Sequence, residues 1–190
     1  MFGVPLVATS GVPQAKLIHA AIVMAEYLDN NEDGSVDDPA VVQAMHDSNA
    51  LVVMFENFEE SANKNRQSPG WLDGYLASDL YADETMPSWQ TDPNLVILHT
   101  IQLSGYRFVH EDLSPLSLKL LEALDIARGG WFIHTPASHP DGAWFHYDRE
   151  ECNRECNANW YLYWGLTSLL GAQKHRCEEI KDQWELCKKN

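Results

Sequence analysis

Residues 29–38 most restrict how this chain folds, because they place oxygen-bearing side chains at alternate positions around a glycine. Asp29, Asn31 and Asp33 precede that glycine, Gly34, which permits a sharp turn. Val36 is expected to point inward, and Asp37 returns a carboxylate near the ninth place of the loop. Five carboxylates fall within these ten residues without a Lys or Arg. They repel one another unless a cation lies between them. The spacing therefore predicts a calcium loop that joins two helices.

The loop departs from a full EF-hand at its twelfth position, where Ala40 replaces the usual bidentate Glu. Shorter loops of the pattern DxNxDGxxD occur in extracellular calcium modules, and here Asp38 or Glu26 is the candidate to complete the ligand shell. Calcium affinity is therefore expected to be weak. The alternative is an Asn/Asp/Gly-rich turn that ends a helix and holds no ion.

Composition indicates one globular domain over residues 1–190, since 45% of the chain is hydrophobic, with seven Trp, seven Tyr and six Phe. A formal charge of −15 disfavours nucleic acid, whose phosphates need clustered Lys and Arg. Calcium ions or a mineral surface are the expected partners. No membrane span is expected, because no apolar run reaches about 20 residues. The start lacks signal-peptide features, so either the precursor's start is missing or the protein stays inside the cell.

The four cysteines, Cys152, Cys156, Cys177 and Cys187, all fall in the last 40 residues. An even, clustered set is typical of a disulfide-stapled subdomain in an oxidising compartment, which indicates secretion. Three pairings are possible, and an antiparallel helical hairpin favours Cys156 with Cys177 and Cys152 with Cys187. The alternative is a zinc site of these thiols with His175, although no CxxC spacing is present.

Hydrophobic spacing predicts a mainly α fold of about six helices, with α+β as the alternative. Three helix starts combine a capping residue with proline, at Asp38-Pro39, Asp92-Pro93 and Ser114-Pro115. The expected helices cover residues 15–28, 39–46, 93–105, 115–129, 159–170 and 178–188. Residues 50–55 suit a buried strand, although their length also allows a helix, and residues 57–70 are expected to be a surface loop. The last two helices are expected to form the disulfide-stapled hairpin.

Residues 130–148 contain three histidines, five aromatic residues and two prolines, which excludes an ordinary helix. A rigid loop that carries His134, His139 and His146 can bring their imidazoles together on a zinc or copper ion. The alternative is an aromatic lid over the core, with the histidines hydrogen-bonded to the backbone. No HExxH or other fixed-spacing pair favours the metal.

A metal-dependent enzyme, such as a hydrolase, is the alternative function that these residues suggest. His19 or His99, on the expected helices, supplies a further nitrogen ligand, and Glu26 or Glu56 acts as general base. No nucleophile elbow, Gly-rich phosphate loop or known protease motif accompanies them. The catalytic residues therefore remain unassigned.

Four motifs lie along most of the chain: HAA at 19–21, AEYLDN at 25–30, AWFHYD at 143–148 and YLYWGLTSLLGAQ at 161–173. In combination they resemble a poorly characterised group of secreted proteins of marine invertebrates. The resemblance implies an extracellular location and no particular activity. Acidic secreted proteins of shell- or skeleton-forming animals often enter the mineral matrix. The expected function is therefore that of a secreted, acidic, calcium-binding extracellular matrix protein, involved in biomineralization.

The sequence Trp144-Phe145-His146 is similar to the Trp-x-His of methanotroph surface copper-binding proteins. In those proteins an oxidised tryptophan, kynurenine, binds copper together with two histidines. The resemblance implies Trp144 and His146 as copper ligands. No position in this chain matches the second histidine.

Overall fold

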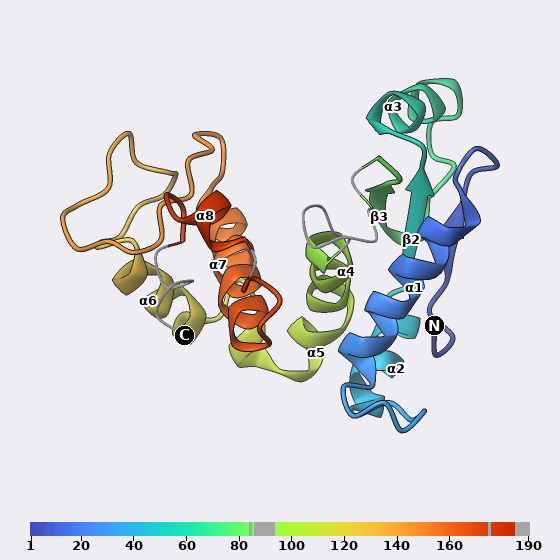
Figure 1. The fold of residues 1–190 in the computed structure, drawn as a ribbon, viewed down its shortest axis with the longest axis horizontal. Coiled ribbons are helices and arrows are strands. Elements are labelled where there is room, and N and C mark those ends of the chain that lie inside the picture. Colours follow the sequence, from blue (N-terminus) through green and yellow to red (C-terminus); the bar gives the residue numbers. More distant parts are fainter. Residues whose placement is uncertain (84, 86–93, 175, 185–190) are drawn as a thin grey trace. The chain divides into compact units, whose positions relative to one another are not determined.

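The computed structural model describes residues 1–83, 85, 94–174 and 176–184. Its backbone contacts fall into two compact units, Met1–Val109 and His110–Asn190. They are coloured blue through green and yellow through red in Figure 1. The single domain expected over residues 1–190 stays a prediction.

The first unit alternates strands with helices around a small parallel sheet. Its elements are β1 (Leu6–Ala8), α1 (Gln14–Leu28), α2 (Pro39–Asp47), β2 (Ala50–Phe55), α3 (Phe58–Gln67), β3 (Leu76–Tyr81), α4 (Asn94–Ile101), the π-helical turn η1 (Gln102–Tyr106) and α5 (Arg107–Val109). The strand order is β1-β2-β3, with Leu6 opposite Val52 and Ala50 opposite Leu76. Parallel neighbours need long crossovers, which α1 with α2 and then α3 provide.

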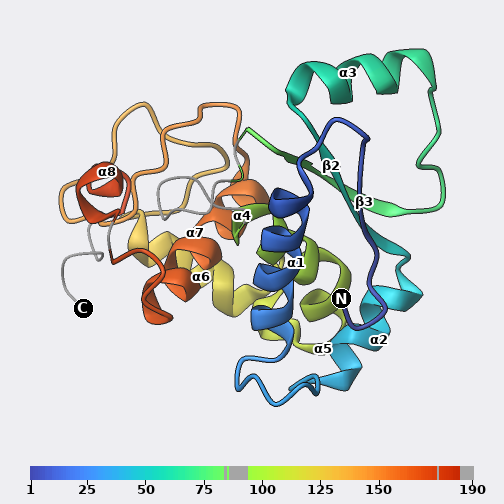
Figure 2. The same ribbon diagram turned by 45° about the vertical axis from the view of Figure 1, so that its right-hand side comes forward.

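The central strand β2 holds the first unit together, because its side chains alternate between two apolar clusters. Every second residue, beginning with Ala50, packs with α1, α2 and α4, whereas the intervening residues, ending with Phe55, join a smaller cluster around Trp71. All six residues are buried. Figure 2 shows α1 alongside the strands and α3 beyond their ends. A strand covered on both faces reads as a continuous apolar run, and the predicted strand at 50–55 is confirmed.

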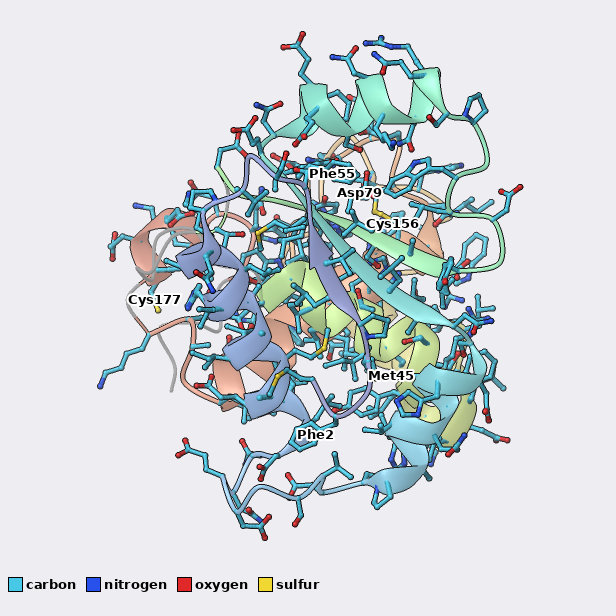
Figure 3. The ribbon with its side chains drawn as sticks, turned by 90° about the vertical axis from the view of Figure 1, so that its right-hand side faces the viewer. Phe2, Met45, Phe55, Asp79, Cys156 and Cys177 are labelled. Carbon is cyan, nitrogen blue, oxygen red and sulfur yellow. A yellow bond between two sulfur atoms is a disulfide. The ribbon has the colours of Figure 1, made fainter. Side chains whose placement is uncertain are left out.

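Residues 57–70 are not simply a surface loop, as expected, because α3 occupies most of them. The side chain of Asn57 caps the helix by accepting the N–H of Glu60 at 3.0 Å. Acidic residues in the first turn and basic residues in the last complement the helix dipole. Only Ser61 is buried on this helix, so the sequence contains no apolar stripe that would predict the helix. β3, whose Asp79 lies below α3 with Phe55 in Figure 3, was also not predicted.

The second unit contains η2 (Glu111–Leu113), α6 (Leu118–Ala127), α7 (Arg154–Leu169) and α8 (Cys177–Ile180). The helix expected at 115–129 is present as α6, but it begins at Leu118 and is capped by Ser117, so the predicted start at Ser114-Pro115 is wrong. The helix expected at 159–170 begins five residues earlier than predicted, at Arg154. The helix expected at 178–188 is the short α8, and residues 185–188 lie outside the described part. With the sheet of the first unit, this helix-rich chain fits the α+β alternative.

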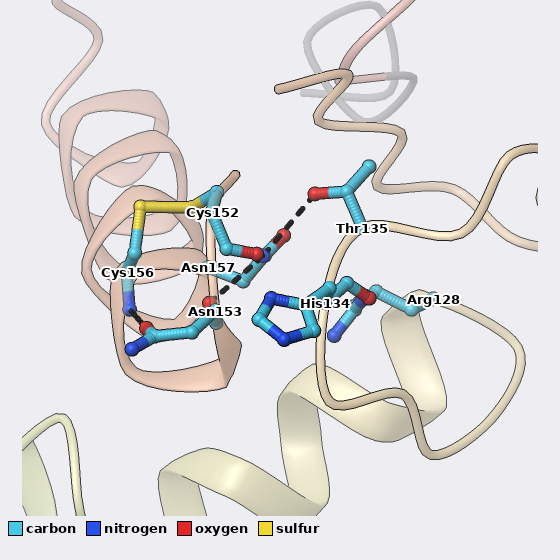
Figure 4. The surroundings of a disulfide bond; sticks show 7 residues. All are labelled: Arg128, His134, Thr135, Cys152, Asn153, Cys156 and Asn157. Carbon is cyan, nitrogen blue, oxygen red and sulfur yellow. Dashed lines mark hydrogen bonds between the residues drawn. A yellow bond between two sulfur atoms is a disulfide. The ribbon is translucent and has the colours of Figure 1, made fainter. Parts of the chain in front are cut away.

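Cys152 forms a disulfide with Cys156 at the start of α7, with the two Cα atoms 5.4 Å apart. In Figure 4 the side chain of Asn153 caps the helix by accepting the N–H of Cys156 at 2.9 Å. The first helical turn thus brings the two cysteines together locally. The expected pairings of Cys156 with Cys177 and of Cys152 with Cys187 are therefore wrong, and this bond does not staple a hairpin.

Cys177 is also disulfide-bonded. The pairing of Cys187 lies outside the described residues, as does His175. Because thiols in a disulfide cannot bind zinc, the alternative zinc site built from Cys152, Cys156 and Cys177 is not formed in this state.

Replacing both Cys152 and Cys156 with Ser is expected to lower the free energy of unfolding by about 2 kcal/mol, because the bond closes a loop of only five residues. A bond from Cys156 to Cys177 would have closed a loop of about 22 residues and contributed about 3 kcal/mol. Urea unfolding of the two proteins under non-reducing conditions measures the difference. A loss well above 3 kcal/mol would show that the bond stabilises more than a local turn.

Candidate metal-binding sites

The acidic loop runs from the end of one helix to the start of the next. Asp29 is the residue that ends α1, and Asp38 caps α2 by accepting the N–H groups of Ala40 and Val41. Val36 packs against the main core, as the loop pattern predicts. Because the Asp38 carboxylate already caps α2, it is a less suitable ligand than the sequence suggested.

Two loop residues adopt left-handed backbone angles, Glu32 with φ +59° and Gly34 with φ +86°. Glycine adopts such angles without steric cost, whereas Glu does so only under constraint from its surroundings. The sharp turn predicted at Gly34 is therefore present.

The side-chain oxygens of the loop accept hydrogen bonds from the loop's own backbone. The two carboxylate oxygens of Asp29 accept the N–H groups of Asp33 at 3.1 Å and Gly34 at 2.9 Å. Asn31 Oδ1 also accepts the N–H of Asp33, at 2.9 Å, and Asp33 Oδ1 accepts that of Ser35 at 2.8 Å. Asp29 is only 7% exposed, so it anchors this turn from the protein side.

Asp37 closes the loop from its other end. One carboxylate oxygen accepts the N–H of Asn30 at 2.8 Å, and the other accepts the side-chain amide of Asn31 at 3.3 Å. The N–H of Asp37 in turn donates to the carbonyl of Leu28 at 2.9 Å. These bonds hold Asp29 and Asp37 at the two ends of one turn.

Calcium needs several of these oxygens around one point, and each carboxylate oxygen that accepts one hydrogen bond keeps a second lone pair. Across the described ranges, no group of three or more His, Cys, Asp or Glu side chains is arranged to hold a metal ion. The exposed side chains of Asp33 and Asp37 would have to turn toward Asp29 when an ion binds. Calcium binding by Asp29, Asn31, Asp33 and Asp37 stays a prediction.

Tyr106 lies near the acidic loop, although the sequence did not indicate it as part of a site. Burial raises the pKa of its hydroxyl, and the negative charges of Asp38 and Asp37 raise it further. The tyrosine comes from the π-helical turn η1, about 70 residues away in sequence, so no local pattern indicates this proximity.

The loop between α6 and α7 brings two of its three histidines together. The rings of His139 and His146 lie with their centroids 4.9 Å apart, and His146 Nε2 lies 2.9 Å from the carbonyl oxygen of Ala143. Burial lowers the pKa of His139, and the neighbouring His146 lowers it further. The backbone of Tyr147 raises this pKa. Neither ring nitrogen of His139 makes a hydrogen bond within the described structure.

His134 is separate from this pair, because its contacts run to Arg128 and Asn153. Its carbonyl accepts a hydrogen bond from Nη2 of Arg128 at 2.6 Å, and its backbone forms an isolated antiparallel bridge with Asn153. Its side chain is exposed. The predicted meeting of His134, His139 and His146 is therefore not seen, since only the last two lie together.

Arg128 is the largest fully buried side chain of the chain's described residues, with 0% exposure. It donates Nη1 to the carbonyl of Phe132 at 3.2 Å, in addition to its bond with His134. Its positive charge also lowers the pKa of His139. A buried guanidinium beside the histidine pair disfavours a second cation there.

Trp144 packs among aromatic rings, as the alternative of an aromatic lid predicts. Its ring centroid lies 5.3 Å from that of Trp184 and 5.9 Å from that of Tyr161. The neighbouring Phe145 is fully buried, and Trp184 donates Nε1–H to Ser168 Oγ at 2.9 Å. This packing accounts for the dense aromatic composition of the loop without a metal.

The remaining candidates of the enzyme alternative lie in the first unit. His19 and Glu26 are on α1, and His99 is on α4. Glu56 follows β2 and packs so closely on Gly11 that a Cβ at position 11 would lie 2.5 Å from its carboxylate carbon.

Comparisons of the chain with protein-family models, curated proteins and solved structures found no significant match. Within the described ranges, no helix combines the length and the apolar composition that crossing a lipid bilayer requires.

Proposed function

We propose that this protein binds one calcium ion in the loop Asp29–Asp38 and acts as an acidic calcium-binding protein of the extracellular matrix. The observation that carries the proposal is the loop's geometry, which joins two helices through a left-handed Gly34 and an inward Val36. Asp29, Asn31 and Asp33 already face the loop backbone through their oxygens. A cation bound there would relieve the repulsion among the five carboxylates.

The charge distribution supports a cation as ligand. Residues 1–109 carry 15 Asp and Glu against four Lys and Arg, a formal charge of −11 out of the −15 of the whole chain. A potential of this sign raises the local concentration of divalent cations around the loop.

The extracellular location is supported by the disulfide between Cys152 and Cys156, because such bonds persist in oxidising compartments. A mineral matrix is the further expectation from the resemblance to secreted marine proteins. The cations of a mineral surface bind carboxylates, and the acidic first unit carries many carboxylates.

The alternative, a zinc or copper enzyme, has weaker support. It needs at least three ligands, whereas His139 and His146 are the two that lie together. The buried cation of Arg128 nearby would oppose the metal.

Titration calorimetry of the purified protein is expected to show one calcium ion bound with a Kd of about 10⁻⁴ to 10⁻³ M, because the twelfth-position carboxylate is missing. Asp33→Asn removes one ligand charge but keeps an oxygen that can accept the N–H of Ser35. This variant is expected to bind calcium about tenfold more weakly, a loss of about 1.4 kcal/mol, while unfolding unchanged in the absence of calcium.

Asp47→Asn is the matched control, since it removes the same charge from an exposed residue at the end of α2, outside the loop. Its calcium affinity should stay close to that of the wild type. If Asp33→Asn and Asp47→Asn weaken binding equally, general acidity binds the ion and the loop is only a turn.

A further inference from the structure

β3 forms an edge of the parallel sheet, and half of its peptide groups point away from β2. Leu76 and Ala82, at its two ends, donate their N–H groups toward the β2 chain with N···O distances of 3.1 and 2.8 Å. In a parallel strand both polar groups of one residue face the same neighbour, and the direction alternates along the chain. The N–H and C=O groups of Ala77 and Asp79 therefore face outward.

A groove of about 290 Å³ runs along this edge, with α4 and the start of η1 as its wall. The wall residues Val96, His99, Thr100 and Leu103 follow the spacing i, i+3, i+4, i+7, so they lie on one helical face. Leu76 contributes an apolar side chain that is 39% exposed. The groove thus combines a row of peptide groups with a partly apolar wall.

An extended peptide is the ligand that this combination fits, because a fourth strand would pair with the outward groups of β3. The side chains of β3 alternate between the two faces of the sheet. Ser78 lies on the face that packs against α4, and Asp79 lies on the opposite face, where it accepts a hydrogen bond from Ser61 Oγ. An added strand alternates in the same way. Its apolar side chains would lie against Val96 and Leu103, and its other side chains would lie on the face of Asp79.

The negative charge of the first unit determines which extended peptides are attracted to the groove. The first unit carries a formal charge of −11, so a basic peptide is attracted, whereas a second copy of this chain is repelled. We propose that the β3 edge groove binds an extended, positively charged peptide with alternating apolar and basic residues as a fourth strand of the sheet. This binding is separate from the calcium loop and does not depend on it.

The probe is a fluorescein-labelled peptide of four Lys-Val repeats, tested for binding to the full chain by fluorescence anisotropy. Two peptides of equal length serve as comparisons: four Lys-Pro repeats keep the charge but lack alternate N–H groups, and four Glu-Val repeats reverse the charge. The Lys-Val peptide is expected to bind at least about tenfold more tightly than either. Hydrogen exchange of the Ala77 and Asp79 amides should slow when it binds.

Ala77→Pro removes an outward N–H without breaking a bond to β2, and it is expected to weaken peptide binding at least about tenfold. Ala8→Pro is the matched control, because Ala8 also points away from β2 but lies on the opposite edge strand, β1. Its affinity should match that of the wild type. Circular dichroism confirms that both variants fold.

Equal binding of the Lys-Pro and Lys-Val peptides would overturn the proposal, because charge alone would then explain the affinity. An unchanged affinity of Ala77→Pro would overturn it as well. A concentration-dependent dimer that Ala77→Pro abolishes in sedimentation experiments would show that a second copy, and not a basic peptide, occupies the edge.

Discussion

Arg128→Ala is expected to lower the free energy of unfolding of the second unit by about 3–5 kcal/mol. The side chain is 0% exposed, so its removal leaves a cavity. The carbonyls of Phe132 and His134 lose the donors Nη1 and Nη2 at the same time. Each of these charge-assisted bonds contributes about 1.5–3 kcal/mol. Burial lowers the pKa of the guanidinium, as expected for a positive charge that is removed from water.

Arg128→Met separates the two contributions, because methionine fills much of the same volume without donors or charge. Arg128→Met should lower the free energy of unfolding by about half as much as Arg128→Ala does. Arg149→Ala, at an exposed position, is the control for the loss of an arginine charge. Urea unfolding followed by tryptophan fluorescence reports mainly on this unit, which holds five of the seven Trp. A loss below about 1 kcal/mol for Arg128→Ala would contradict a structural role.

Phe55→Ala is expected to destabilise the first unit by about 3–5 kcal/mol. The ring is fully buried at the end of β2 and packs edge to face with Trp71 at 6.1 Å between centroids. Its cluster is the smaller of the two that cover the sheet, so few neighbours are available to fill the cavity. Phe55→Leu retains most of the side-chain volume and should lower the free energy of unfolding by about 1 kcal/mol.

Phe58→Ala is the matched control, since the same residue type three positions later is 69% exposed. Its cost should stay below about 1 kcal/mol. Native-state hydrogen exchange of the β2 amides measures the free energy of opening for this unit alone. Equal losses for Phe55→Ala and Phe58→Ala would mean that this face of the sheet is not a closed core.

The elements that were predictable from sequence are those with a local signal. Asp38-Pro39 marks a cap and a first helical residue, and α2 begins there. Helical apolar spacing located α1, α4, α6 and α7, although the Asp92-Pro93 start lies outside the described residues. β3 has the sequence LASDLY, in which only Leu80 is buried, so it carries no continuous apolar run. The parallel order of the strands depends on crossovers that no single segment encodes.

The candidate sites divide in the same way. The turn at Gly34 and the inward position of Val36 follow from spacing within ten residues, and both are present. The separation of His134 from His139 was not predictable, because the backbone of His134 bonds to Arg128 and Asn153, and no local pattern indicates these contacts. An arginine is rarely buried without a paired carboxylate, and nothing in the sequence distinguishes this one from a surface residue.

The parallel sheet also determines when this protein can begin to fold during its synthesis. Leu6 pairs with Val52, 46 residues later, whereas Ala50 pairs with Leu76 after only 26. At 5–20 residues per second, the ribosome therefore leaves β1 unpaired for roughly 2–9 s before its neighbour exists. β3 is synthesised a further 26 residues after β2, so β1 and β2 can pair before β3 exists. The edge strand β3 is then the last to join the sheet.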